Sequence, residues 1–185
     1  RASRRLDAPR RDLDDETRDT HDLLELTREL FKVTGDVKYA DYYERALLNE
    51  IRSVIAPGPV LPAYLEPMGA GYFEESGKET EALRCCRGTG MKRLTQLSEG
   101  IYSHDATDLS VNLYVSSTLA WPERELALTQ TADVPLSPTV VFTIDAAPAA
   151  ELAIKLRRPS WLAAGELATL TTANARRVFG LTDAG

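Results

Sequence analysis

Residues 23–36 read LLELTRELFKVTGD, and residues 37–55 continue as VKYADYYERALLNEIRSVI. Apolar residues recur every three or four positions in both segments, which is typical of amphipathic helices. Gly35 stands where a helix commonly ends, and Asp36 is a favoured N-cap residue for a second helix. Because the connection is so short, the sequence predicts an antiparallel helical hairpin. The expected helices are 23–33 and 39–55, and the side chains expected to be buried between them are Leu26, Leu30, Tyr43 and Leu47.

The spacing of apolar residues changes near residue 105. Beyond that point apolar and polar residues alternate in short runs with prolines at their ends, as is typical of strands. The fold class is therefore predicted to be α+β, with a helical part at residues 1–105 and an antiparallel β-sandwich part at residues 106–185. The four expected strands are 109–115, 126–131, 140–144 and 152–156, and Val111, Leu113, Val141 and Ile154 are expected to be buried in them.

The composition is that of an ordinary globular chain. Of 185 residues, 43% are apolar and 27% are charged, which excludes a mainly disordered or fibrous protein. The net charge of −6 argues against a nucleic-acid partner, because such proteins usually carry a basic surface. No apolar stretch is long enough to cross a membrane. Residues 1–22 mix many charges of both signs with few apolar residues, and we expect a solvated end there.

The most unusual local feature is the pair Cys85-Cys86, followed by Gly88-Thr89-Gly90 and then by helical spacing as far as Tyr102. A thiol at a helix N-terminus is exposed to unpaired N–H groups and to the positive end of the helix dipole, which favour the thiolate. A thiolate is a nucleophile and a zinc ligand. Two alternatives remain open from the residues alone: a redox-active dithiol, and two buried cysteines that act as small apolar side chains.

Other candidate side chains are weaker. His104 is expected to cap the end of the third helix, and His21, beside acidic neighbours, is expected to be solvated. Glu44 and Glu50 lie on the second expected helix, where Glu50 is most simply part of a solvated face. The sequence contains no phosphate-binding loop, dinucleotide fingerprint or serine nucleophile elbow.

Several segments, taken together and in this order, resemble the β-L-arabinofuranosidase family of glycoside hydrolases, of the glycoside hydrolase family 127 type. The resemblance runs from about Glu16 to Trp161. The vicinal cysteine motif is the most specific part. The segments are LTRELF at 26–31, TGD at 34–36, YADYYERALLN at 39–49, CCRGTGM at 85–91 and DLSVNLY at 108–114.

The resemblance implies a fold and a site. Family members have an (α/α)6 barrel followed by β-sandwich domains, so this chain is expected to supply the last barrel helices and the start of the sandwich. They hold zinc with three cysteines and a glutamate, use one of those cysteines as the nucleophile of a retaining mechanism, and use another glutamate as acid/base. Carried over, the nucleophile is Cys85, the metal ligands are Glu16, Cys85 and Cys86, and the substrate-binding residues are Glu44 and Tyr64.

The chain also departs from the family pattern. Arg18 stands where the third zinc cysteine is expected, and Lys92 replaces a glutamate that usually follows the cysteine motif. No residue of this chain matches the acid/base glutamate. We therefore expect a divergent fragment with hydrolase ancestry, zinc as the implied cofactor, an arabinose-containing oligosaccharide or glycoconjugate as substrate, and little or no activity. The alternative is a non-catalytic relic or carbohydrate-binding module. A reducing, cytoplasmic setting is expected because it protects a thiolate nucleophile.

Overall fold

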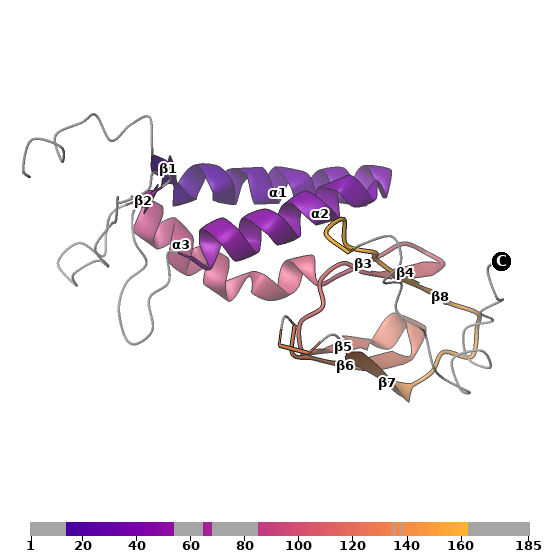
Figure 1. The fold of residues 1–185 in the computed structure, drawn as a ribbon. Coiled ribbons are helices and arrows are strands. Elements are labelled where there is room, and N and C mark those ends of the chain that lie inside the picture. Colours follow the sequence, from indigo (N-terminus) through magenta and orange to yellow (C-terminus); the bar gives the residue numbers. More distant parts are fainter. Residues whose placement is uncertain (1–13, 54–64, 68–84, 135, 138, 163–185) are drawn as a thin grey trace, which may run out of the picture. The chain divides into compact units, whose positions relative to one another are not determined.

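The computed structural model of the chain describes residues 14–53, 65–67, 85–134, 136–137 and 139–162 (Figure 1). Its architecture is α+β, as predicted, with helices first and most of the strands after them. The chain divides into two compact units, Arg1–Leu97 and Ser98–Gly185. No helix in these described ranges combines the length and apolarity needed to cross a bilayer.

The predicted helical hairpin is present in the first unit. Helix α1 spans Thr17–Thr34, and helix α2 spans Val37–Ala46. Gly35 adopts a left-handed φ of 65° and its N–H donates to the carbonyl of Phe31 at 2.7 Å, which ends α1. The Asp36 carboxylate then accepts from the backbone N–H of Lys38 at 3.0 Å and caps α2. The turn therefore forms as its two residues predict.

Both helices differ from expectation at their outer ends. Helix α1 begins at Thr17, inside the segment expected to be a solvated end. That expectation is wrong for Thr20 and His21, which are buried, whereas Arg18, Asp19 and Asp22 are exposed. Helix α2 continues into a π-helical turn, η3, at Leu47–Ile51. Both end residues of this turn are buried, and the wider π-helical spacing brings them to the same side.

The buried face of α1 agrees only in part with the face that its apolar spacing predicts. Leu24 is fully buried, whereas Leu26 is 54% exposed, so the prediction for Leu26 is wrong; Leu30 is half-buried. The side chains buried along α1 are Thr20, His21, Leu24 and Thr27. In α2 and η3, Tyr43 and Leu47 are buried as predicted. Contacts with α2 and α3 therefore use a partly polar stripe of α1, and a neighbouring apolar stripe stays exposed.

The first unit is completed by two short strands and a third helix. Strands β1 (Asp14–Glu16) and β2 (Leu65–Pro67) pair antiparallel, with Glu16 opposite Leu65. Helix α3 spans Cys85–Thr95 and packs against α1. The helix includes the segment 85–90, although helical spacing in the sequence is evident only after Gly90. A 3₁₀ turn, η5, follows at Leu97–Gly100, so the helical spacing as far as Tyr102 does not produce one continuous helix.

All four predicted strands of the second unit are present, and two more strands accompany them. The strands are β3 (Tyr102–His104), β4 (Asp108–Val111), β5 (Ser117–Trp121), β6 (Leu126–Ala132), β7 (Val140–Ala146) and β8 (Ala153–Leu156). A 3₁₀ turn, η6 (Pro122–Arg124), joins β5 to β6. Strands β5, β6 and β7 form an antiparallel sheet, and β3, β4 and β8 form another.

One pairing contradicts the expectation of a wholly antiparallel arrangement, because β4 and β8 are parallel, with Leu109 opposite Ile154. Strand β8 follows β7 of the other sheet, so no hairpin connects it to β4 or imposes an antiparallel direction. Strand β4 also ends at Val111, short of the predicted residue 115. Beyond it, the side-chain amide of Gln130 donates to the carbonyl of Leu113 at 3.1 Å, where a continued strand would place a ladder bond.

Side chains from both three-stranded sheets share one apolar core. Its fully buried members are Leu109, Leu126, Leu128 and Leu152, with Ile154 partly buried against them. Val111 and Leu113 are also buried, as predicted. Val141 is 52% exposed, so the prediction for that residue is wrong. In β7 the side chains that face the core are Phe142 and Ile144, which are partly buried against it.

Candidate functional site

The residues that the sequence singled out fall mainly at the starts of two helices in the first unit. Glu16 is the last residue of β1 and directly precedes α1, and Cys85 and Cys86 are the first two residues of α3. The backbone therefore places Cys85 at a helix N-terminus, where unpaired N–H groups favour a thiolate. The side chains of these three residues, and the whole of Tyr64, lie outside the described residues.

Glu44 is buried in α2 and takes part in polar or electrostatic contacts there. Its burial removes it from the class of ordinary solvated helix carboxylates. Glu50 is half-buried in η3 and accepts a hydrogen bond from the hydroxyl of Thr20, which is itself buried in α1. The expectation that Glu50 belongs to a solvated face is therefore wrong, because the carboxylate ties η3 to the start of α1.

Arg18 is the residue that the resemblance sets at the position of a third zinc cysteine. Its side chain is exposed, and its Nε lies 3.8 Å from a carboxylate oxygen of Asp22, one helical turn further along α1. An exposed pair at this distance contributes little to stability. The guanidinium is therefore directed along the solvent face of α1.

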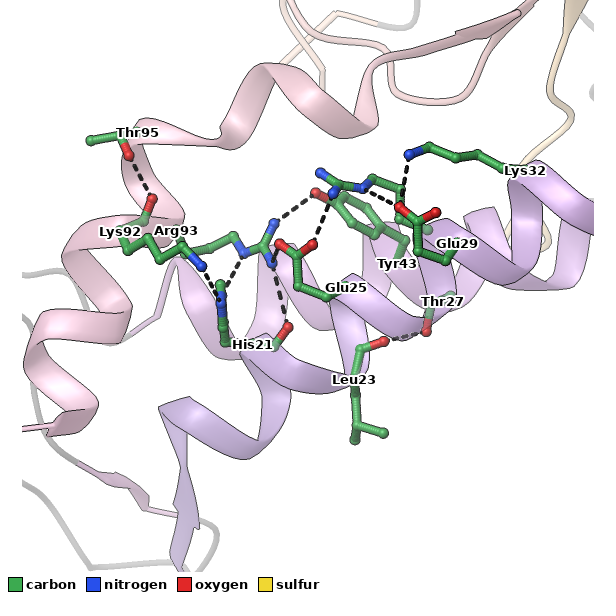
Figure 2. A network of polar contacts seen from close by, with 11 residues as sticks. His21, Leu23, Glu25, Thr27, Glu29, Lys32, Tyr43, Lys92, Arg93 and Thr95 are labelled. Atoms are coloured by element: carbon green, nitrogen blue, oxygen red, sulfur yellow. Dashed lines mark hydrogen bonds and ion pairs between the residues drawn. The ribbon is translucent and has the colours of Figure 1, made fainter. Parts of the chain in front are cut away.

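Arg93 forms the centre of a buried polar network that joins α3 to α1 and α2 (Figure 2). Its side chain is 0% exposed. Nη2 donates to the Glu25 carboxylate at 2.6 Å, and Nε donates to Nδ1 of His21 at 3.1 Å. Nη1 donates to the Tyr43 hydroxyl at 3.3 Å. Because every donor group of the guanidinium points at an acceptor, a charge that is costly to bury is compensated.

His21 is a buried, neutral member of this network. A guanidinium can only donate, so Nδ1 must accept and the ring hydrogen lies on Nε2. The pKa of His21 lies below its ordinary value, first because burial disfavours the charged ring and then because Arg93 and Lys92 repel it. Glu25 and Asp22 oppose this shift without overcoming it. The expectation of a solvated His21 is therefore wrong.

His104 does not cap a helix, because it ends strand β3 in the second unit. Its ring lies 4.2 Å from that of Trp121, measured between centroids and tilted by 36°. The helix that it was expected to cap has already ended at Thr95. The role of His104 in the described structure is an aromatic contact between β3 and β5.

Sequence reasoning missed Arg93 altogether. Its only sequence signal was a basic residue among the helically spaced residues that follow the cysteine motif, which is usually a solvated position. Within the described residues, no group of three or more histidine, cysteine, aspartate or glutamate side chains is arranged to hold a metal ion. The side chains of the three predicted zinc ligands are not among the described ones.

Known proteins match the chain in both units. The GH127 β-L-arabinofuranosidase catalytic-domain profile matches residues 2–99, and the middle-domain profile of the same family matches residues 108–178. No curated protein matches the sequence.

Two solved structures are similar to the chain. The GH127 β-arabinofuranosidase BT3674 has a TM-score of 0.68 and 24% sequence identity over 79% of this chain and 23% of its own. A GH127 β-L-arabinofuranosidase from Geobacillus stearothermophilus T6 has a TM-score of 0.58 and 25% identity over 79% of this chain and 25% of its own. The chain thus spans about a quarter of the length of either relative. With more than half of its residues covered by the catalytic-domain profile alone, the chain belongs to the GH127 family of β-L-arabinofuranosidases.

Proposed function

We propose that this chain carries the nucleophile and part of the metal site of a retaining β-L-arabinofuranosidase, with an arabinose-containing oligosaccharide or glycoconjugate as substrate. The observation that carries the proposal is the catalytic-domain match over residues 2–99, within which Cys85-Cys86 opens helix α3. The family's architecture would make α1, α2 and α3 the last helices of an (α/α)6 barrel. The two sheets that share a core would then form the start of a β-sandwich.

The donor set fits zinc by its chemistry. Two thiolates and one carboxylate are common ligands of this ion, and three protein ligands are typical of catalytic zinc sites, which keep one position open. Glu16, Cys85 and Cys86 would hold the ion. When bound, zinc keeps cysteine sulfur deprotonated at neutral pH.

The steps assigned to this chain follow retaining chemistry. The Cys85 sulfur attacks the anomeric carbon, the bond to the leaving-group oxygen breaks, and a covalent thioglycoside forms. Water then attacks the same carbon and passes one proton to an acid/base carboxylate, while the bond from carbon to sulfur breaks and Cys85 leaves as thiolate. Buried Glu44, together with Tyr64, which lies outside the described residues, is proposed to bind sugar hydroxyls. Protonation of the leaving group needs an acid/base carboxylate, for which this chain supplies no matching residue.

A second candidate is a non-catalytic member that keeps the fold and has lost the metal. Arg18 favours it, because an arginine occupies a ligand position and a guanidinium cannot bind zinc. The redox dithiol has no observation in its favour beyond the two adjacent cysteines.

Zinc content and hydrolysis of a chromogenic β-L-arabinofuranoside separate these candidates. For the hydrolase site we expect stoichiometric zinc that is lost in Cys85→Ser and in Cys86→Ser while the helical circular dichroism signal stays unchanged. Metal-free protein with no hydrolysis and an unaltered fold would support the non-catalytic candidate. Hydrolysis that survives Cys85→Ser would overturn the assignment of the nucleophile.

A further inference from the structure

Arg93 links two helices, each of which begins at the predicted metal ligands. It lies eight positions after Cys85 in α3, and its partners His21 and Glu25 lie in α1, which starts directly after Glu16. Helices α1 and α3 pack against each other, and Figure 1 shows both beginning at the end of the first unit where β1 and β2 are drawn. The contacts of Arg93 are therefore made within a few helical turns of all three predicted ligands.

The contacts of Arg93 with α1 constrain both translation and rotation. Nε and Nη2 reach two acceptors one turn apart, Nδ1 of His21 at 3.1 Å and the Glu25 carboxylate at 2.6 Å. Nη2 also donates to the His21 carbonyl at 3.4 Å (Figure 2). A planar fork that engages acceptors on successive turns allows one register between the helices, which a single ammonium group would not enforce.

The acceptor in α1 is itself held in place by a second contact. Glu25 accepts from Arg28 at 2.8 Å in addition to Arg93, so its carboxylate is held from within its own helix. It would keep a cationic partner if Arg93 were replaced. The Tyr43 hydroxyl supplies a third direction of contact, from α2, which carries none of the predicted metal ligands.

We propose that Arg93 is a positioning residue for the metal site: through His21 and Glu25 it sets the register between α1 and α3, and thereby brings Glu16 beside Cys85 and Cys86. This inference rests on the proposed function for its metal, although the juxtaposition of the two helix starts stands without one. It predicts that the register between α1 and α3 depends on the forked shape of the guanidinium. A side chain that keeps only the positive charge, or only the volume of the apolar stem, should not maintain that register.

The first measurement is the zinc affinity of the full chain, by competition with a chromophoric chelator. We expect Arg93→Lys, which keeps the charge, and Arg93→Met, which keeps most of the apolar stem, to weaken binding by on the order of tenfold or more. Tyr43→Phe is the matched control, because it removes one hydrogen bond of the same guanidinium on the α2 side only. Its affinity should stay within about twofold of the parent, well below that effect.

A second measurement needs no metal. In Glu16→Cys, air oxidation should form a disulfide between position 16 and Cys85 or Cys86, which requires Cα atoms within about 7 Å. We expect Arg93→Met in that background to slow the cross-link by on the order of tenfold, and Tyr43→Phe to leave its rate unchanged. Circular dichroism at the same temperature checks that all variants are folded. If Arg93 only stabilised the fold, the cross-linking rate of the folded variants would not change.

The outcomes separate the inference from the proposed function. A parent chain that binds no zinc, with a cross-link that depends on Arg93, refutes the metal and supports the positioning role. Unchanged zinc affinity together with an unchanged cross-linking rate in folded Arg93→Met overturns the positioning role. Failure of position 16 to cross-link with either cysteine in the parent background overturns it as well.

Discussion

At the scale of the residue, His21 is buried although its sequence neighbours predict a solvated position. Its neighbours Asp22 and Asp19 suggest a solvated position, yet the ring is 5% exposed. The group that makes burial possible is Arg93, which lies 72 positions away in the sequence and donates to the ring. A local pattern of charges carries no information about such a partner.

The buried histidine predicts a pH dependence of stability. Its folded pKa lies below the unfolded value of about 6.5, so the unfolded chain binds the proton more tightly. Its contribution is therefore complete above that unfolded value and is lost as the pH falls below it, at no more than about 1.4 kcal/mol per pH unit for one proton. Urea midpoints between pH 7.5 and 5 measure this loss.

The control for this titration is His21→Gln, whose side-chain oxygen can accept from Arg93 but does not titrate in this range. We expect its stability to fall less steeply than that of the parent chain between pH 6.5 and 5, with the carboxylates contributing equally to both. Parallel pH profiles would show that His21 does not titrate on unfolding.

Arg18 yields a second prediction at this scale. Since its exposed side chain pairs only weakly with Asp22, replacing it should disturb the fold little. Arg18→Cys restores the third thiolate of the family pattern. It should raise zinc affinity by at least about tenfold, since even the outer partners of a metal ligand change affinity by that factor. Arg18→Ser separates the loss of the cation from the gain of a ligand. Equal affinities in Arg18→Cys and Arg18→Ser would contradict the inherited metal site.

At the scale of the element, α1 shows that an apolar residue with helical spacing is not always buried. Leu23, Leu26 and Val33 follow helical spacing, and all three are exposed. The adjacent stripe that packs against α2 and α3 contains Leu24 and several polar residues that are hydrogen-bonded, including Thr27, whose hydroxyl donates to the Leu23 carbonyl. The apolar period therefore predicts the helix correctly and its buried face only in part, since Leu24 is buried and Leu26 is exposed.

Two leucines of this helix provide a matched test. Leu24→Ala removes a fully buried side chain and should destabilise the first unit by about 2–5 kcal/mol. Leu26→Ala removes a side chain that is half in solvent and should change stability by only about 0.5 kcal/mol. Urea denaturation followed by circular dichroism compares them. Equal losses would mean that α1 buries a different face in solution.

At the scale of the whole molecule, the chain's two units match two domains of the family. The unit Arg1–Leu97 corresponds closely to the catalytic-domain match at 2–99, and the unit Ser98–Gly185 contains the middle-domain match at 108–178. The expected boundary at residue 105 lies between the two matched ranges. All residues of the proposed metal site belong to the first unit.

That assignment predicts where zinc should stabilise the chain. Ligand binding stabilises the structure to which the ligand is attached, so added zinc should slow amide hydrogen exchange in α1 and α3. Exchange in β6 and β7 should stay unchanged. Cys85→Ser should abolish the protection. Protection confined to the strands would place the metal in the second unit and refute the proposed ligands.

The sequence by itself determined the features that depend on neighbouring residues. Gly35 and Asp36 specify the turn between α1 and α2 through a left-handed φ and a capping carboxylate, both of which are local effects. Alternation along 126–131 predicts β6, and the largely apolar run 140–144 between Pro138 and Pro148 predicts β7. The ordered motifs around Cys85 indicated the family, which the domain matches confirm.

Only the tertiary structure decided the features that depend on distant partners. The buried face of α1 is chosen by α2 and α3. The lowered pKa of His21 comes first from its burial and then from the charge of Arg93. The parallel pairing of β4 with β8 is set by a connection that passes through the other sheet. Burial and pairing are properties of two surfaces at once, and a sequence pattern describes one of them.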